Sequence, residues 1–391
     1  MKILLCNKFY YRRGGDCIYT MNLEQLLKSH GHEVAIFSQQ YPLNEPSPWS
    51  KYWPSEFKMK PSLNMIDSLL RPFGYGSVRQ RFKAILDDFQ PDVVHLNNIH
   101  TQLSPILAEV AHERGIRVIW TIHDTKFVCP CYSCMRDGKW CEECFTEKKA
   151  VIKHKCMPGG ALGSYIGYKE AMKWTPARLQ ENVDAFICPS QFLADTLVKG
   201  GFSSEKLNIH SNFIDTNRIS DTQQKRDNYY VYLGQLNPIK GIKTLCEVAA
   251  TLPYKLIVIG SGTLENQLRT EYQQSKQIEF LGQLSWEAVK PLLANAKFMV
   301  LPSECSENNP ISIIESLCLG TPVLGAKIGG IPELIKETNG MTFQSTDQKS
   351  LFDGINQMWR KQFDYQQISS DASYKFGDEQ YYNALLNLYK S

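Results

Sequence analysis

The stretch Pro302-Ser303-Glu304-Cys305-Ser306-Glu307-Asn308-Asn309-Pro310-Ile311-Ser312-Ile313-Ile314-Glu315 predicts a polar loop followed by a short helix. Pro310 suits the first helical position, and either Asn308 or Asn309 can cap the helix. The following Gly320-Thr321-Pro322 is typical of a helix end. We therefore expect a helix over residues 310–319 that begins directly after a polar loop.

Glu315 is unusual because four apolar residues share its face of the predicted helix. These are Ile311, Ile314, Cys318 and Leu319. A carboxylate buried there without partners would cost roughly several kcal/mol, so it needs hydrogen-bond donors, and a sugar diol supplies two. Glu307, eight positions earlier, can reach the same ligand. The alternative is that Glu315 pairs with a nearby lysine and that Glu307 is solvated.

Length and charge narrow the class of protein. A chain of 391 residues is expected to form two domains, and a net charge of +3 without a long basic tail argues against a nucleic-acid binder. The apolar run at 1–7 is too short for a signal peptide, and no segment reaches membrane-spanning length. We expect a cytoplasmic protein whose 12 cysteines are thiols or metal ligands.

The first half of the chain has the pattern of a parallel-sheet domain. An apolar run is followed by a loop containing Gly14-Gly15, a helical pattern to about His30 and a second apolar run. Such strand, loop, helix, strand units build parallel sheets. The predicted strands are 2–7, 33–37, 93–96, 118–121 and 185–188.

The same pattern restarts at Tyr229, so a second sheet domain is expected. Its predicted strands are 229–234, 256–260, 279–282 and 298–301, with a helix over 242–252. Ligands of such sheets bind at the carboxyl ends of the strands, so two facing domains would close on one cleft. We predict a first domain (1–214), a linker (215–228), a second domain (229–372) and a final helix (373–391).

Three glycine loops follow predicted strands. Gly14-Gly15 opens the first helix, whose N-terminal N–H groups favour an anion, although such a pair is also typical of a simple tight turn. Lys240-Gly241 adds a positive charge suited to a diphosphate. The third loop contains Gly262 and lets a nucleotide approach the backbone. No dinucleotide fingerprint is present, which argues against a nicotinamide dehydrogenase.

With these motifs the chain resembles the retaining glycosyltransferases of family four, which include bacterial surface-polysaccharide enzymes with the GT-B fold of two facing Rossmann-like domains. The resemblance covers nearly the whole length. It implies that residues 1–214 form the N-terminal acceptor-side domain, that residues 229–372 form the nucleotide-sugar-binding domain, and that the final helix (373–391) returns to the first domain. The most specific signal is Glu307 and Glu315, separated by seven residues and followed by Gly-Thr-Pro-Val. The other motifs that carry it are Gly14-Gly15, Gly31-His32-Glu33-Val34, Thr121-Ile122-His123-Asp124, Pro189-Ser190, Asn212, Gly234 and Lys240-Gly241.

This resemblance implies a retaining, metal-independent transfer of a hexosyl or related sugar from a nucleoside-diphosphate sugar to a hydroxyl acceptor. It implies that Glu315 holds the ribose, that Glu307 holds the donor sugar and that Lys240 neutralises the leaving diphosphate. Gly15 approaches the phosphate, and neutral His123 lies near the anomeric centre. The expected donor-binding set is Gly15, Gln235, Lys240, Gly262, Glu307, Asn308, Asn309, Pro310, Ile311 and Glu315, and the acceptor side is Arg12, Arg13, Gly14 and Asp124.

Two positions depart from the family pattern. Gln235 replaces the usual arginine beside the donor phosphates, which removes a bidentate charge contact that Arg12, Arg13 or Lys327 would have to replace. The loop after Glu307 is Asn-Asn-Pro instead of Gly-Phe-Gly. We therefore expect its amides to contact the sugar hydroxyls.

Six cysteines follow His123 within a single insert. Two Cys-x2-Cys pairs with a short spacer predict a structural zinc site. The alternatives are reduced thiols or redox-dependent disulfides, and His154 is a weaker candidate ligand. The residues are Cys129, Cys131, Cys134, Cys141, Cys144 and Cys156.

Basic residues with helically spaced apolar ones follow the insert. The basic set is Lys148, Lys149, Lys153, His154 and Lys155, with Arg71, Arg79, Arg81 and Lys83 elsewhere in this half, and the apolar set is Leu162, Tyr165, Ile166, Ala171, Met172 and Trp174. This pattern fits either an anionic membrane surface or a helix packed on its own domain. The family's lipid-linked acceptors imply a peripheral contact with the inner face of the plasma membrane.

Two other functions remain open from the sequence. A nucleotide-sugar epimerase on the same fold would convert a donor without an acceptor. A zinc-dependent binding module would leave the glycine loops and the paired glutamates without a role.

Overall fold

The computed structural model describes residues 1–58, 65–216, 219 and 225–391. Two compact units make up the chain: the first is Met1–Ser211 with Tyr382–Ser391, and the second is Asn212–Tyr381. Of the predicted linker, residues 217–218 and 220–224 lie outside the described part.

The first unit is built on a parallel six-stranded sheet in the order β2-β1-β3-β4-β7-β8. Its inner strands are rich in Val, Ile and Leu and almost fully buried, as expected where helices cover both faces, whereas the edge strand β8 is partly exposed. The strands are β1 (Lys2–Cys6), β2 (Glu33–Phe37), β3 (Val93–Leu96), β4 (Arg117–Thr121), β7 (Ala185–Cys188) and β8 (Leu207–Ile209).

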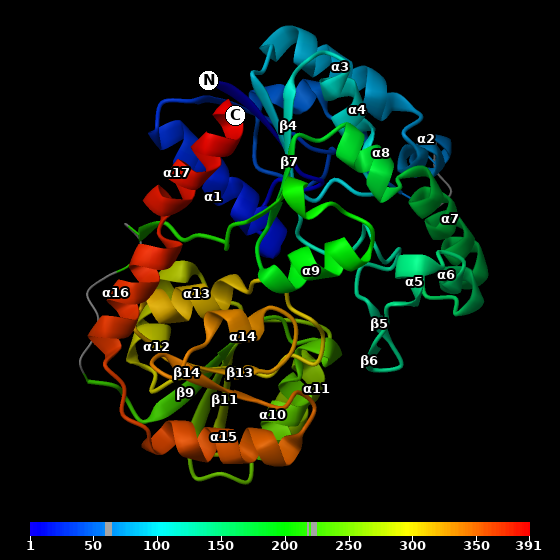
Figure 1. Cartoon of the computed structure of the whole chain (residues 1–391). Helices are drawn as coiled ribbons and strands as arrows, with labels where there is room; N and C mark the ends of the chain where they lie inside the picture. The colour runs from blue at the N-terminus through cyan, green and yellow to red at the C-terminus, as the bar shows by residue number, and fades with distance from the viewer. Residues whose placement is uncertain (59–64, 217–218, 220–224) are drawn as a thin grey trace. The chain divides into compact units, whose positions relative to one another are not determined.

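Helices of the first unit lie mainly between successive strands (Figure 1). They are α1 (Gly15–Ser29), α2 (Met65–Leu70), α3 (Ser77–Phe89), α4 (Ile106–His112), α5 (Glu143–Thr146), α6 (Ala150–Lys153), α7 (Gly160–Lys173), α8 (Pro176–Glu181) and α9 (Gln191–Lys199), with 3-10 turns η1 (Pro48–Tyr52), η2 (Arg71–Phe73) and η3 (Ser204–Lys206). A two-stranded hairpin, β5 (Met135–Arg136) and β6 (Lys139–Trp140), lies in the cysteine insert.

The second unit repeats this plan with the sheet order β11-β10-β9-β12-β13-β14, again with every pair parallel. Its strands are β9 (Tyr229–Leu233), β10 (Lys255–Ile259), β11 (Ile278–Gly282), β12 (Met299–Leu301), β13 (Val323–Ala326) and β14 (Gly340–Phe343). Its helices are η5 (Pro238–Lys240), α10 (Ile242–Ala249), α11 (Glu265–Glu271), α12 (Trp286–Asn295), α13 (Ile311–Cys318), α14 (Ile331–Leu334), α15 (Gln348–Arg360) and α16 (Tyr365–Phe376).

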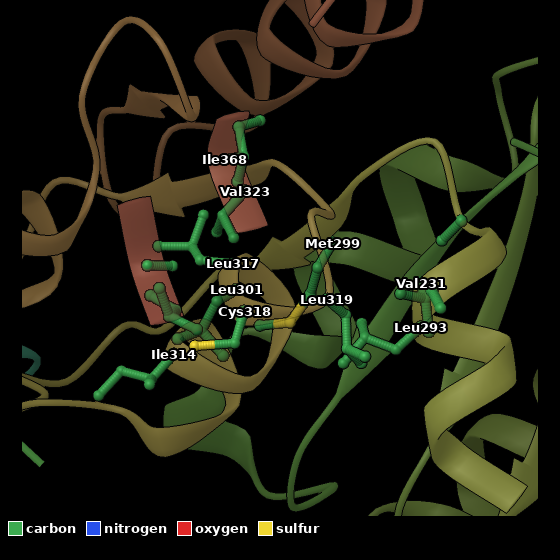
Figure 2. Close-up of a cluster of buried hydrophobic side chains, with 14 of the residues drawn as sticks. Val231, Leu293, Met299, Leu301, Ile314, Leu317, Cys318, Leu319, Val323 and Ile368 are labelled. Atoms are coloured by element: carbon green, nitrogen blue, oxygen red, sulfur yellow. The ribbon is translucent and has the colours of Figure 1, made fainter. Parts of the chain in front are cut away.

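One helix face anchors the glutamate motif in the core of the second unit. Figure 2 shows Ile314, Leu317 and Cys318 of α13 together with Val323 and Ile368, all of them buried. Apolar area buried in this way stabilises the fold by about 25 cal/mol per Å². The position of α13 against the sheet is therefore fixed by its apolar side chains.

The last predicted helix proves to be two helices. α16 ends at Phe376, Gly377 is extended, and α17 (Asp378–Lys390) follows. The break forms because Gly377 pairs with Ile214 and Asp378 accepts a hydrogen bond from the Thr216 hydroxyl, 2.7 Å. Within the first unit, Tyr382 of α17 stacks on His30 at the end of α1, with 3.7 Å between ring centroids.

Candidate active site

An ion pair lies at the carboxyl ends of the two central strands of the second unit's sheet. The sheet order places β9 beside β12, and the chain leaves these two neighbouring strands towards α10 and α13. Lys240 comes from the loop after β9 and Glu307 from the loop after β12, and Lys240 Nζ lies 2.5 Å from Glu307 Oε1. This is the point where the strand order reverses, at which open α/β sheets bind their ligands.

The pair is shielded but still accessible. About 23% of the Lys240 side chain and 17% of the Glu307 side chain are exposed. Burial lowers the pKa of Lys240, but the charge of Glu307 and the hydrogen bond to it outweigh burial and leave that pKa above its usual value. Ser303 also donates to Glu307 Oε1, at 2.8 Å. Glu307 is thus held by two donors, either of which a ligand can replace.

Two glycines allow the loops to approach each other. Gly241 has φ +66°, and a Cβ there would lie 1.9 Å from the Pro302 carbonyl oxygen. Gly329 has φ +59°, and a Cβ there would lie 2.3 Å from the Glu307 carbonyl oxygen, which accepts from Gly330 N–H at 2.7 Å. Both positions require a residue without a side chain. Gly241 sets the distance between the lysine loop and the glutamate loop, and Gly329 sets the distance between the loop after β13 and the glutamate loop.

Gln235 is exposed in the loop after β9, and Asn237 Nδ2 donates to its Oε1 at 2.9 Å. The loop containing Gly262 lies directly beside it, because Leu236 N–H donates to Ser261 and Leu264 N–H donates back to Leu236, each at 2.9 Å. Lys327 is exposed after β13. The predicted phosphate loops after β9 and β10 are therefore neighbours.

Glu315 lies on α13 at the edge of its buried face. Ile314 and Cys318 are fully buried, whereas Ile311 and Glu315 are half-buried. Three of the four apolar residues predicted to share its face, Ile314, Cys318 and Leu319, are buried. The most deeply packed side of α13 also includes Ile313 and Leu317, so Glu315 lies beside this face and not at its centre.

The prediction that Asn308 or Asn309 caps α13 is wrong. Pro310 itself is the N-cap, with extended backbone and no side-chain cap bond. Asn309 is buried and turns elsewhere: its Oδ1 accepts from Asn212 N–H at 2.9 Å, and its carbonyl accepts from Asn212 Nδ2 at 2.7 Å. Asn309 thereby ties the glutamate loop to the start of the second unit, and Asn308 is the residue of the pair that stands nearer to solvent.

A separate cavity of about 840 Å³ in the second unit is lined by residues between Leu334 and Gln380, including Lys336, Lys361 and Tyr374. It contains none of the predicted donor residues. We place the donor site at the strand ends because the charged pair, the glycine loops and the strand reversal coincide there.

In the first unit, Gly14 caps α1 with extended backbone and Gly15 begins it. A Cβ at Gly15 would meet no atom within 4 Å, so the N-terminus of α1 is open to a ligand on this side. Arg13 stacks over the Phe9 ring at 4.6 Å, and Arg12 donates to Asn22 at 3.5 Å. Both arginines extend from the loop that follows β1.

His123 follows β4 and is held by its neighbours. Its Nε2 lies 3.2 Å from Asn97 Oδ1, and its ring lies edge-on to Tyr19 at 5.0 Å. Burial lowers the pKa of His123, while Asp16 and Asp124 oppose that effect. A neutral imidazole follows, and since an amide oxygen only accepts, Nε2 carries the proton and Nδ1 is the acceptor.

Asp124 and His100 are close without forming an ion pair. His100 Nε2 lies 3.8 Å from Asp124 Oδ1, but burial holds the pKa of His100 well below its usual value, so the imidazole is neutral. Burial raises the pKa of Asp124, while Lys8 and the N–H of Lys126 lower it. Lys8 thus supplies positive charge near the Asp124 carboxyl group.

Sequence reasoning missed four residues of these sites: Lys8, Asn97, Ser303 and Cys305. Asn97 follows the end of β3 directly, and Ser303 comes two residues after the end of β12. Ligands of parallel sheets bind at such strand ends, so this position could have identified both residues. Burial and the charge of Glu307 raise the pKa of the Cys305 thiol to about 11.

The predicted basic surface is smaller than expected. Arg71 is fully buried, and its guanidinium donates hydrogen bonds to Ser55 and to Asp67. Lys148 is partly buried and donates to the Val128 carbonyl at 2.9 Å. In the described ranges, no helix is both long and apolar enough to cross a membrane.

Comparison with known proteins places these features in context. A family model described as "Glycosyltransferase Family 4" matches residues 13–218, and one described as "Glycosyl transferases group 1" matches residues 213–375. An "Uncharacterized 42.6 kDa protein in cps region" of Klebsiella pneumoniae is 25% identical over 85% of this chain and 87% of its own length.

Two further proteins are similar. The "Putative colanic acid biosynthesis glycosyltransferase WcaL" of Escherichia coli strain K12 is 26% identical over 43% of this chain, and the match spans about half of that relative (46%). Anabaena Alr3699/HepE, crystallised with UDP and glucose, superposes with a TM-score of 0.66 at 16% identity, covering 99% of this chain and 98% of the other. The shared architecture confirms the predicted GT-B fold class.

Proposed function

Because this chain belongs to glycosyltransferase family 4, we propose that it transfers a sugar from a nucleoside-diphosphate sugar to a hydroxyl of a saccharide acceptor, with retention at the anomeric carbon. The acceptor is a lipid-linked saccharide in surface-polysaccharide assembly. The cps-region and colanic-acid relatives support this acceptor class, and the UDP in the crystals of Alr3699/HepE supports the donor class.

The Lys240–Glu307 pair carries the proposal. In the free protein each charge is neutralised by the other at 2.5 Å. A bound donor brings a diphosphate, which attracts the ammonium, and sugar hydroxyls, which donate to the carboxylate. Exchange of one ion pair for two ligand contacts costs little desolvation, because both side chains are already partly shielded. Glu315 on the neighbouring helix α13 would receive the ribose.

The same residues supply the chemistry of transfer. Negative charge grows on the leaving diphosphate as the glycosidic bond breaks, and Lys240 and loop N–H groups stabilise it. The acceptor hydroxyl attacks the face from which the diphosphate departs, and the departing phosphate takes the hydroxyl proton. No protein nucleophile is needed in this scheme. His123, neutral and fixed by Asn97, offers Nδ1 as a hydrogen-bond acceptor to a sugar or acceptor hydroxyl.

A membrane contact belongs to the proposal because the acceptor is lipid-linked. Several apolar side chains of α2, α7 and the turn between η2 and α3 are exposed in the first unit: Ile66, Leu70, Tyr75, Leu162, Tyr165 and Met172. Lys173 lies over the Tyr75 ring at 4.0 Å, and Lys169 lies over the Tyr165 ring at 5.8 Å. Apolar groups with adjacent lysines fit an anionic lipid surface.

Turnover of a donor panel tests the function. The full chain is incubated with UDP-, GDP- and ADP-sugars and a lipid-linked saccharide, and the product is examined by proton NMR at the anomeric position. We expect one donor to yield a new glycoside with the donor's configuration. Inverted configuration would contradict retention, and conversion of the donor to its epimer without an acceptor would contradict a transferase.

Flotation with liposomes tests the membrane contact. Binding to vesicles with anionic lipid, and its loss in the double variant Leu162→Ser/Tyr165→Ser, is the expected result. The control is Tyr374→Ser, since Tyr374 is 74% exposed but lies in the second unit. Equal flotation of all three proteins would contradict a contact at α7.

A further inference from the structure

The cysteine insert of the first unit brings two Cys-x2-Cys pairs together. Cys131 and Cys134 precede strand β5, and Cys141 and Cys144 follow strand β6. The hairpin pairs these strands antiparallel, and Cys141 N–H donates to the Cys134 carbonyl at 2.8 Å. The fold therefore converts a sequence spacing into a spatial cluster.

Four sulfur atoms gather around Cys129. Its Sγ lies 3.3 Å from Cys131 Sγ, and the thiols of Cys134 and Cys144 are also close to it. Cys129, Cys134 and Cys144 are almost fully buried. Cys156 is close to Cys131 and packs at the edge of the small cluster that contains Cys144. Cys129 is thus the thiol on which Cys131, Cys134 and Cys144 converge.

A hydroxyl group and an ammonium group lie beside the sulfurs. Cys131 Sγ lies 3.6 Å from Ser133 Oγ. Lys148 is close enough for its charge to interact with Cys129, Cys134 and Cys144. Four thiolates around a divalent ion carry two net negative charges, and this ammonium offsets one.

The insert has only a small hydrophobic cluster of its own. Its hydrophobic cluster has only three buried members, Cys144, Ala150 and Val151. Tyr132, Cys134 and Asp137 have φ values of 56°, 49° and 51°, which L-residues adopt at a cost of roughly 1–3 kcal/mol each. A core this small does not offset such strain, and small units of this kind are usually stabilised by a metal or by disulfides.

We propose that Cys129, Cys131, Cys134 and Cys144 bind one zinc ion as a tetrahedral structural site. Throughout the described residues, no group of three or more His, Cys, Asp or Glu side chains is already arranged to hold a metal. The Sγ atoms of Cys129 and Cys131 lie 3.3 Å apart. With Zn–S bonds of about 2.3 Å, tetrahedral sulfur pairs lie about 3.8 Å apart. Small side-chain rotations that increase the distance between Cys129 Sγ and Cys131 Sγ by about half an ångström meet this requirement.

The site would fix the loop that carries His123. Cys134 Sγ lies 3.2 Å from Thr125 Oγ1, and that hydroxyl donates to the Tyr132 carbonyl at 2.9 Å. His123 and Asp124 are the two residues before Thr125. Zinc would therefore fix the position of the loop that carries His123 and take no part in the transfer reaction. Its effect on turnover rests on the proposed function, whereas zinc binding itself does not.

Metal content of the full chain tests the proposal. Protein expressed in zinc-supplemented medium is dialysed and measured by elemental mass spectrometry, and we expect close to one zinc per chain. Cys131→Ser and Cys144→Ser should each lose most of it. Cys156→Ser is the matched control, because Cys156 belongs to the same insert but not to the set of four, and it should retain the metal.

Two measurements on the wild type avoid the risk that a variant fails to fold. Zinc-edge X-ray absorption should show sulfur neighbours only, at about 2.3 Å, and a chelator should expose the insert to protease between residues 129 and 157. A wild-type chain purified without zinc, or with nitrogen and oxygen neighbours around it, overturns the proposal. Disulfides in its place, detected by peptide mass spectrometry, overturn it as well.

Discussion

Lys240 and Glu307 come from the loops after two neighbouring parallel strands and meet at 2.5 Å. They are 67 positions apart in the chain, so the contact depends on the strand order of the second unit. Loss of either partner leaves the other charge partly buried, which usually costs more than the pair contributes.

Glu307→Gln separates the two proposed roles of the pair. The amide keeps the shape but loses the charge, so Lys240 is released for the diphosphate. Because the amide cannot accept from the sugar hydroxyls as a carboxylate does, turnover should fall at least about a hundredfold, whereas the Kd for the nucleoside diphosphate changes by less than about fivefold. Steady-state rates and calorimetry measure the two quantities. Equal losses in both would contradict separate roles.

Gly241→Ala should destabilise the second unit and abolish nucleotide binding. The added Cβ would stand 1.9 Å from the Pro302 carbonyl oxygen at φ +66°. Gly115→Ala provides the control: its φ is +68° but no atom lies within 4 Å, so it isolates the backbone strain of about 1–2 kcal/mol. The Tm should therefore fall further for Gly241→Ala than for Gly115→Ala. Equal shifts in Tm would show that the close approach is unimportant.

Asn97→Asp should move the pH dependence of turnover. Burial lowers the pKa of His123 in the native protein, so its imidazole stays neutral as the pH falls below 6.5. A carboxylate at 3.2 Å from Nε2 would favour the charged ring and raise that pKa. The acid limb of kcat/KM should then appear at higher pH. A purely structural role of Asn97 would lower the rate without moving the limb.

His95 should make the first unit sensitive to acid. Burial lowers its pKa to about 3 from an ordinary 6.5, and its ring contacts Thr121 at 2.8 Å and Tyr389 at 2.6 Å. Below pH 6.5 the unfolded chain binds a proton that the folded chain does not, so stability falls by up to about 1.4 kcal/mol per pH unit until pH reaches about 3.

Denaturant unfolding between pH 7 and pH 4.5 measures this dependence. His95→Gln retains hydrogen-bonding groups without titrating, so its free energy of unfolding should decline less steeply with falling pH than that of the wild type. Parallel declines would show that His95 is not a source of the acid sensitivity.

The sequence predicted nine of the twelve strands that form the two described sheets, because buried parallel strands are nearly continuous apolar runs, as at 93–96 and 185–188. It missed β8, β13 and β14. It also identified Lys240 and Glu307 as candidate donor-binding residues. It could not predict that they pair with each other, since that contact depends on strand order. The cap of α13 was misassigned because Asn309 is engaged by Asn212, 97 positions away. Arg71 was assigned to the surface because only the tertiary structure shows its burial beside Asp67 and Ser55.

Donor binding at the ion pair is the central claim. Calorimetric titration of UDP, GDP and ADP into wild type, Lys240→Ala and Lys243→Ala tests it directly. Lys243 is the control because it lies three residues away, on α10, with 55% of its side chain exposed. We expect one nucleotide to bind the wild type and Lys243→Ala alike, and to bind Lys240→Ala about 10- to 100-fold more weakly. Unchanged affinity in Lys240→Ala would contradict the account.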